Sequence, residues 1–238
     1  MQTHRLRLGG VIAAAVVGLA MMAACGDDDF SNLTPEQRAH AIRTLVQFTQ
    51  GGGDRVLRAG HDTRVGALVT DVAGLPVEGA GVIWSTAQGS GSVAADASDT
   101  DADGSVRGTW TLGTIAGIQE VVATVDGTNV LDRNDVVVFP DSVVGSLTVA
   151  SRASIVHGDT TRVLVTDARD RYGNAYVLTG TSAANPPPIE FTSLTPSILT
   201  LISTTSRSAL VSGVAAGTGV IVARSDGKAD TVTIQVTP

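Results

Sequence analysis

The sequence has few of the residues that several protein classes require. Its 238 residues include one Cys, one Lys and 3% aromatic side chains, and 23 acidic residues outnumber 16 basic ones. A single Cys excludes an internal disulfide framework and a Cys-based zinc site. The formal net charge of −7 argues against a nucleic-acid partner, because proteins of that class need a basic face to neutralise phosphates.

The residues that are abundant favour β-structure. The 32 Val and 28 Thr fit a pleated surface, and the 27 Gly and 19 Asp are typical of turns. Val106, Gly108, Trp110 and Leu112 alternate with polar residues, as they do in a half-buried antiparallel strand. Beyond residue 50 no long helical period occurs, and turn signals recur about every 8–12 residues. The pattern predicts an all-β fold of antiparallel sandwiches.

The first 24 residues are interpreted as a signal that is removed after export. Arg5 and Arg7 precede an uncharged run over residues 8–24, and the single Cys follows as Cys25. This ending resembles the lipobox of bacterial lipoproteins, which implies that Cys25 carries the lipid and becomes the mature N-terminus. A transmembrane helix is the alternative, but three glycines interrupt the run, whose 17 residues only reach the lower limit for a span. We expect a lipid-anchored protein of the bacterial cell envelope, at the outer membrane or the cell surface.

Residues 25–43 are predicted to form a tether with one short helix. Thr34 suits the N-cap, Pro35 the first helical position, and Gln37 completes a capping box. A strand is expected to follow at residues 45–49.

The remainder of the chain contains an internal repeat. Residues 61–71 align without gaps on residues 157–167, and Trp84 falls opposite Phe191 in the next matching segment. Repeats of about 100 residues have the size of a small β-sandwich. The sequence therefore predicts two tandem domains at residues 44–140 and 141–238, with Trp84 and Phe191 packed between sheets.

Both repeats resemble bacterial immunoglobulin-like (Ig-like) domains. The first is similar to the intimin/invasin type (group 1), on the motifs at residues 69–79, 89–93, 100–104 and 110–117. The second is similar to the group 2 type, on the motifs at residues 191–199, 214–218 and 232–236. One departure is Leu75, where the group 1 pattern usually has Asn. The resemblance implies adhesion or surface association and does not name a ligand.

Acidic residues form one string with the spacing of a calcium loop. Asp99, Asp101 and Asp103 are followed by Gly104, which suits Ca²⁺, but Trp110 stands at the twelfth position, where a bidentate Glu is required. We favour an acidic turn and keep a weak surface calcium site as the alternative; no other cofactor is expected. Residues 167–174, the counterpart of the loop after Asp71, are expected to form a turn with internal charge pairs.

No catalytic or phosphate-binding motif occurs in the sequence, so an enzyme is not expected. The sequence favours a non-catalytic envelope module that acts as an adhesive, a binding module or a spacer, with an unidentified protein or glycan partner besides the membrane. One alternative is an accessory subunit that docks onto a secreted enzyme or envelope complex. The other is a carbohydrate-binding module, for which Trp110, Tyr172 and Tyr176 are the candidate ligand contacts.

Overall fold

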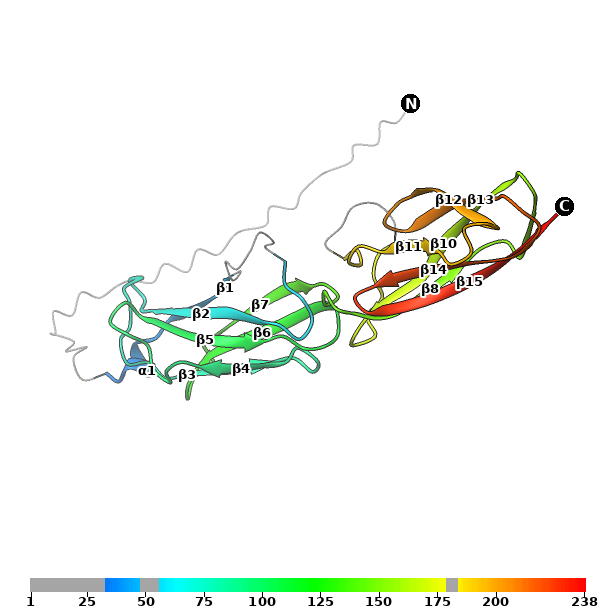
Figure 1. Cartoon of the computed structure of the whole chain (residues 1–238). Helices are drawn as coiled ribbons and strands as arrows, with labels where there is room; N and C mark the ends of the chain where they lie inside the picture. Colours follow the sequence, from blue (N-terminus) through cyan, green and yellow to red (C-terminus); the bar gives the residue numbers. More distant parts are fainter. Residues whose placement is uncertain (1–32, 48–55, 179–183) are drawn as a thin grey trace, which may run out of the picture. The chain divides into compact units, whose positions relative to one another are not determined.

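The computed structural model describes residues 33–47, 56–178 and 184–238, which form β-strands joined by turns (Figure 1). The one helix in these ranges is α1 (Pro35–Arg38), which is far too short to cross a membrane. Its start confirms the predicted capping box. The Gln37 N–H donates to Oγ1 of Thr34, and the Thr34 N–H donates to the side chain of Gln37. The predicted signal and Cys25 lie outside the described residues.

Residues 41–138 form two sheets, here called the first sheet pair. One sheet has four antiparallel strands in the order β1 (Ala41–Gln47), β2 (Asp62–Thr70), β5 (Ser105–Thr111), β4 (Ser92–Ala95). The other has the order β3 (Val82–Thr86), β6 (Gly117–Val125), β7 (Leu131–Val138). Because Ala41 already pairs with Thr70, the assignment of residues 41–43 to the tether was wrong.

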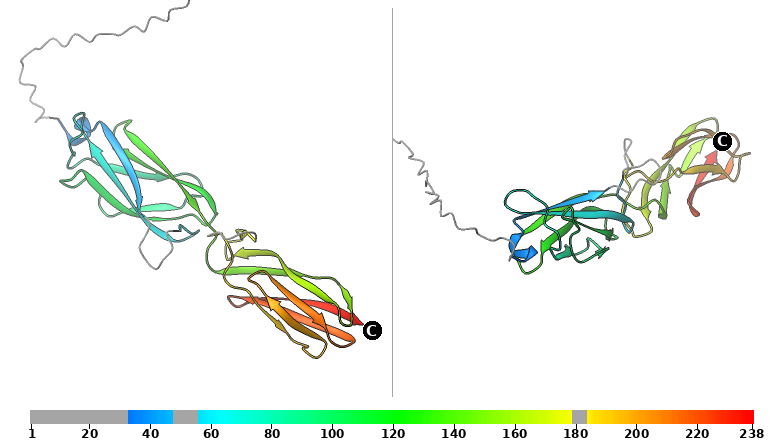
Figure 2. Two further views of the ribbon diagram at one scale, coloured as in Figure 1. Left: turned by 90° about the horizontal axis from the view of Figure 1, so that it is seen from above. Right: turned by 90° about the vertical axis from the view of Figure 1, so that its left-hand side faces the viewer.

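Residues 144–237 form the second sheet pair (Figure 2). One sheet has the order β12 (Leu199–Thr204), β13 (Ser208–Gly213), β10 (Thr160–Asp170), β8 (Val144–Ala150). The other has the order β11 (Glu190–Ser193), β14 (Gly217–Ser225), β15 (Lys228–Thr237), β9 (Ser154–Val156). Strands β9 and β15 run parallel, and all other neighbouring strands in these four sheets are antiparallel.

Each sheet pair buries apolar side chains between its layers. In the first pair Trp84 packs against both hydrophobic clusters, and in the second Phe191 lies within the single cluster. Both positions agree with the expectation from the repeat. Val106, Trp110 and Leu112 are buried, as their alternation predicts. The fold is therefore all-β and built of sandwiches, as expected from the sequence.

Side chains of the opposite sheet cap two edge strands. The Thr44 N–H of β1 donates to Oδ2 of Asp132 on β7, and the Val149 N–H of β8 donates to Oδ2 of Asp230 on β15. An edge strand otherwise presents unpaired N–H groups to other chains. The same device therefore closes one edge in each sheet pair.

Candidate functional site

Three turns of this chain share one geometry and one sequence pattern, Asp-x-x-Gly-x. They begin at Asp71, Asp101 and Asp170, and in each the Oδ1 atom accepts the backbone N–H groups two and four residues further on. The glycine of each has a positive φ, which other residues rarely adopt. Asp is favoured here because its short carboxylate satisfies backbone donors within a turn.

The turn at Asp170 corrects the equivalence inferred from the repeat. The gapless alignment pairs Asp71 with Asp167, but in the structure Asp170 has the role of Asp71. The register of β10 against β8 shifts between Val165 and Asp167, which displaces the chain before the turn. Of the charge pairs expected within this loop, Arg169 Nε contacts Asp167 Oδ2 at 3.0 Å, whereas Arg171 pairs outside the loop.

The carboxylates at Asp99, Asp101 and Asp103 have local partners or face solvent. Asp101 Oδ1 accepts two N–H groups of its turn, Asp99 Oδ2 accepts the hydroxyl of Ser98, and Asp103 is exposed. Across the described ranges no three His, Cys, Asp or Glu side chains gather as a metal site would require. Whether this turn binds calcium stays a prediction.

The three aromatic candidates for ligand contact do not form an exposed row. Trp110 is fully buried and donates through Nε1 to the Ser90 carbonyl oxygen, and Tyr176 is 5% exposed. The interpretation of these two as ligand contacts was wrong, because both lie on the inward face where the sheets pack. Tyr172 is 40% exposed and lies under the guanidinium of Arg171, 5.0 Å from its ring centroid.

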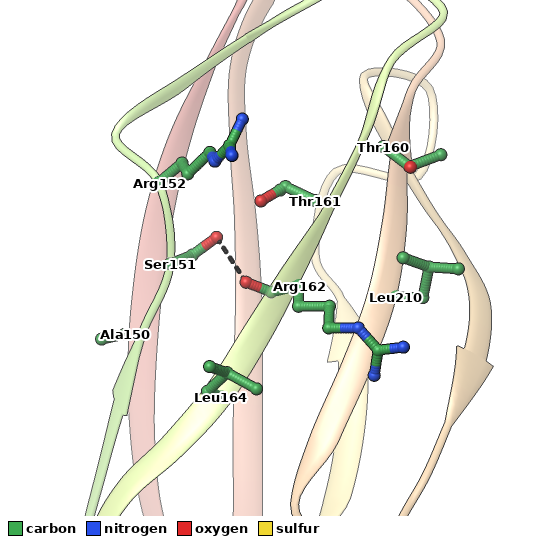
Figure 3. Close-up of a pocket in the computed structure, with 8 residues that line it drawn as sticks. All are labelled: Ala150, Ser151, Arg152, Thr160, Thr161, Arg162, Leu164 and Leu210. Atoms are coloured by element: carbon green, nitrogen blue, oxygen red, sulfur yellow. Dashed lines mark hydrogen bonds between the residues drawn. The ribbon is translucent and has the colours of Figure 1, made fainter.

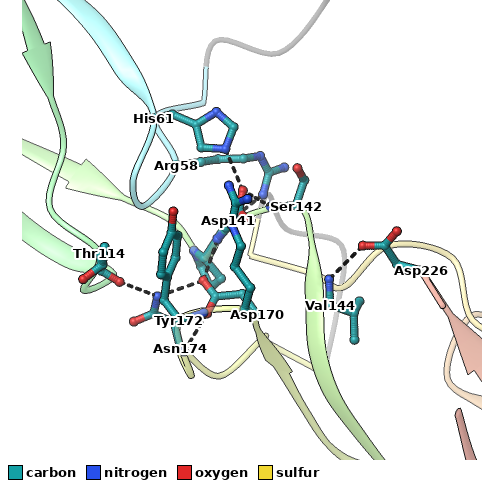
Figure 4. Close-up of polar contacts among 12 residues, drawn as sticks. Arg58, His61, Thr114, Asp141, Ser142, Val144, Asp170, Tyr172, Asn174 and Asp226 are labelled. Atoms are coloured by element: carbon teal, nitrogen blue, oxygen red, sulfur yellow. Dashed lines mark hydrogen bonds and ion pairs between the residues drawn. The ribbon is translucent and has the colours of Figure 1, made fainter. Parts of the chain in front are cut away.

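A polar cluster lies at the junction of the two sheet pairs (Figure 4). Its centre is Asp141, whose side chain has no exposed surface. Asp141 Oδ1 lies 2.6 Å from His61 Nε2, and Oδ2 lies 2.6 Å from Arg171 Nε. His61 directly precedes β2 in the first sheet pair, and Arg171 lies in the turn after β10. One carboxylate thus binds side chains of both.

The backbone around Asp141 is also fully engaged. The Asp141 N–H donates to Asp170 Oδ2, and its carbonyl oxygen accepts the hydroxyl of Tyr176. Arg58 Nη1 donates to the carbonyl oxygen of Pro140 at 2.9 Å. The linker between β7 and β8 is therefore held from the first sheet pair by Arg58 and from the second by Asp170 and Tyr176.

Asn174 ties the Asp170 turn to the first sheet pair. Its Nδ2 donates to the Thr114 carbonyl oxygen at 2.8 Å, and its Oδ1 accepts the Ala116 N–H at 2.9 Å. Next to it, Tyr172 lies so close to Gly60 that a Cβ on that residue would collide with the phenol ring. Gly60 also has a φ of +73°, so glycine is required there for two reasons.

The electrostatics of the junction keep the Asp141 carboxyl ionised. Burial alone raises its pKa, but the hydrogen bonds from His61 and the Ser142 N–H, together with the charge of Arg171, outweigh burial and leave the pKa below its ordinary value. Burial and the negative charges of Asp170 and Asp141 raise the pKa of Tyr176 far above its usual range. Tyr176 therefore stays neutral, and its hydroxyl donates a hydrogen bond to the Asp141 carbonyl oxygen.

Sequence reasoning missed this junction. The relevant signal was the Asp-x-x-Gly-x pattern, which ends in Leu75 in the first sheet pair and in Asn174 in the second. Leu75 is 60% exposed and has no amide to bind a neighbour. Asn174 uses its amide for the two contacts with the first sheet pair.

Comparison with known proteins shows the fold. No protein-family model and no curated protein sequence matches this chain. Among solved structures, the Escherichia coli adhesin FdeC is similar over 83% of this chain and 64% of its own, with a TM-score of 0.51 at 17% identity. This chain therefore shares its β-sandwich fold with that adhesin.

Two further solved structures are similar to this chain at lower TM-scores. InvD of Yersinia pseudotuberculosis aligns over 77% of this chain and 55% of its own, with 20% identity and a TM-score of 0.46. The D0–D1 domain of intimin aligns over 82% of this chain and 98% of its own, with 13% identity and a TM-score of 0.34. The chain spans less than two thirds of the FdeC and InvD structures.

Proposed function

We propose that this chain is a non-catalytic module of the bacterial cell envelope, exported and anchored by lipid at Cys25, whose Ig-like sheets act in adhesion or as a spacer. The sheet architecture, which it shares with a bacterial adhesin, supports the adhesive reading. The lipobox-like ending of its first 25 residues supports the anchor.

The observation that carries the proposal is the junction at Asp141. A buried carboxylate with partners from both sheet pairs, together with the Asn174 contacts, resists bending at the linker. A spacer needs such a joint, because a loose linker would not hold a distal surface away from the membrane. The end turns outside the junction and the edge strands other than β1 and β8 remain available for partners.

The anchor is tested by fractionation. Cys25→Ser removes the only thiol in the chain, so we expect the variant to leave the membrane fraction and appear in soluble fractions. Ser31→Ala, a change of similar size in the predicted tether, is the matched control and stays with the membrane. A Cys25→Ser protein that remains membrane-bound contradicts lipid anchoring.

The accessory-subunit alternative is tested by crosslinking in intact cells followed by purification. A freestanding spacer or adhesin yields no partner in fixed stoichiometry from the cell that makes it. Recovery of one stoichiometric envelope protein or secreted enzyme would replace the spacer proposal by the accessory one. A carbohydrate-binding module with Trp110, Tyr172 and Tyr176 as its contacts needs these rings exposed in a row, and the burial of Trp110 and Tyr176 removes that platform.

A further inference from the structure

An open groove lies on the outer face of the sheet that contains β8, β10 and β13 (Figure 3). Its volume of 550 Å³ is within the size range of small-molecule sites, about 300–1,000 Å³. The walls come from the end of β8, from the residues that follow it, and from β10 and β13. Arg162 and Leu164 are exposed positions of β10, whereas Thr161 has the burial of the positions that face inward. The groove is therefore formed mainly by strands of the second sheet pair.

The groove offers hydrogen-bond donors and positive charge. Arg152 and Arg162 are exposed, and neither guanidinium has an ion pair or hydrogen bond within the described chain. Figure 3 shows Arg152 on the segment that follows β8 and Arg162 on β10, with the Arg162 side chain extending towards Leu210 of β13. Thr161 is only 7% exposed, and its hydroxyl likewise has no hydrogen-bond partner among the described residues.

The described residues that line the groove offer few free hydrogen-bond acceptors. The Arg162 carbonyl oxygen already accepts the Ser151 hydroxyl at 2.9 Å, and none of the described residues that line the groove is acidic. Both arginines line the groove although the chain has a net charge of −7, and neither has a carboxylate beside it among the described lining residues. An anionic ligand would supply the missing acceptors.

We propose that this groove binds the anionic groups of an acidic polysaccharide. The guanidinium forks of Arg152 and Arg162 match carboxylate or sulfate oxygens, and the Thr161 hydroxyl can pair with a sugar hydroxyl. Leu164, 46% exposed, and Leu210 provide apolar surface for the C–H face of a sugar ring. The lining residues that the structure describes include no aromatic side chain, so the proposed recognition is ionic and does not depend on ring stacking.

The proposal rests on the proposed function in one respect, which is that an exported chain meets extracellular polysaccharides. The test uses the full processed chain, purified from membranes in detergent. Binding is measured by biolayer interferometry to immobilised polygalacturonate, to chondroitin sulfate, and to uncharged dextran. We expect binding to one or both anionic polymers at low salt, weaker binding as salt rises, and none to dextran.

Single variants locate the site. Arg152→Gln and Arg162→Gln should each weaken binding about tenfold, the cost of losing one charged hydrogen-bonding partner. Arg224→Gln removes the same charge from the exposed face of β14, in the other sheet of the pair, and should change the Kd less than about twofold. Thr161→Val should also weaken binding, although it removes a hydroxyl and no charge. Melting temperatures of the four variants confirm that they fold.

Three results would overturn the proposal. The first is that the chain binds neither anionic polymer. The second is an equal loss of affinity in the Arg152, Arg162 and Arg224 variants. The third is tighter binding to poly-glutamate than to both polysaccharides. The second result would indicate diffuse charge attraction, and the third an acidic protein partner. None of them affects the fractionation of Cys25→Ser, so failure of this site and failure of the envelope proposal are distinguished.

Discussion

At the scale of single residues, Asp141 is the group whose loss should matter most. Its carboxylate is fully buried, whereas the side chains of His61 and Arg171 are 45% and 46% exposed and can turn to water. We expect Asp141→Ala to lower the free energy of unfolding by about 2 kcal/mol, since two charged contacts and a linker hydrogen bond are lost. Urea denaturation measures this. Asp135→Ala, which removes an exposed carboxylate from β7, is the control and should change stability by less than about 0.5 kcal/mol.

The Asp141 carboxyl should also make the free energy of unfolding depend on pH in a definite direction. Its pKa in the folded chain lies below the ordinary value of 3.8, so the folded state binds fewer protons than the unfolded state at acidic pH. The stabilisation is present above the unfolded pKa and is lost as pH falls through the folded pKa. Unfolding free energy measured from neutral pH downward should therefore fall below about pH 4, and fall less steeply in Asp141→Asn. Equal acid slopes in the two proteins would contradict this account.

Within the acidic string, Asp101 and Asp103 should behave differently. Asp101 Oδ1 accepts two backbone N–H groups, and Asp101→Ala should cost about 1–2 kcal/mol of stability. Asp103 is exposed, and Asp103→Ala should leave the free energy of unfolding nearly unchanged.

Because the Asp101 carboxylate accepts two N–H groups of the turn, we expect millimolar calcium to leave the melting temperature unchanged. A rise with calcium that Asp103→Ala abolishes would establish the metal site instead.

At the scale of elements, we expect the capped edges to limit self-association. Asp132→Ala and Asp230→Ala expose the N–H groups of Thr44 and Val149, each at the edge of a sheet. We expect each change to cost about 1 kcal/mol and to increase aggregation on prolonged incubation, measured by light scattering. Asp135→Ala on β7 lowers the negative charge equally and uncovers no edge, so it should aggregate no faster than the wild type. Equal aggregation of all three variants would attribute the effect to charge.

The elements that the sequence predicts well are those governed by local rules. Alternation placed Val106 and Trp110 on an inward face, and capping chemistry placed α1, because neighbouring residues decide both. The errors arose where tertiary pairing decides. The register shift in β10 makes Asp170 the counterpart of Asp71, and pairing with β2 extends β1 back to Ala41. The junction was missed because its contacts join residues about 30 to 80 positions apart, which no local pattern encodes.

At the scale of the whole molecule, Asn174 should set how freely the two sheet pairs move. Asn174→Leu gives the second turn the residue that the first has at Leu75, and it removes the contacts with Thr114 and Ala116 without altering either core. We expect spin labels on exposed sites of each pair, Arg107→Cys and Ser203→Cys in a Cys25→Ser background, to give a broader distance distribution in Asn174→Leu than in its parent. Leu75→Asn, which adds an amide where the described chain offers it no neighbour, should leave the distribution unchanged. An equally narrow distance distribution in Asn174→Leu and in its parent would contradict this role of Asn174. Asp141 and its partners would then hold the joint alone, and Asp141→Ala in the same labelled background would have to broaden the distribution.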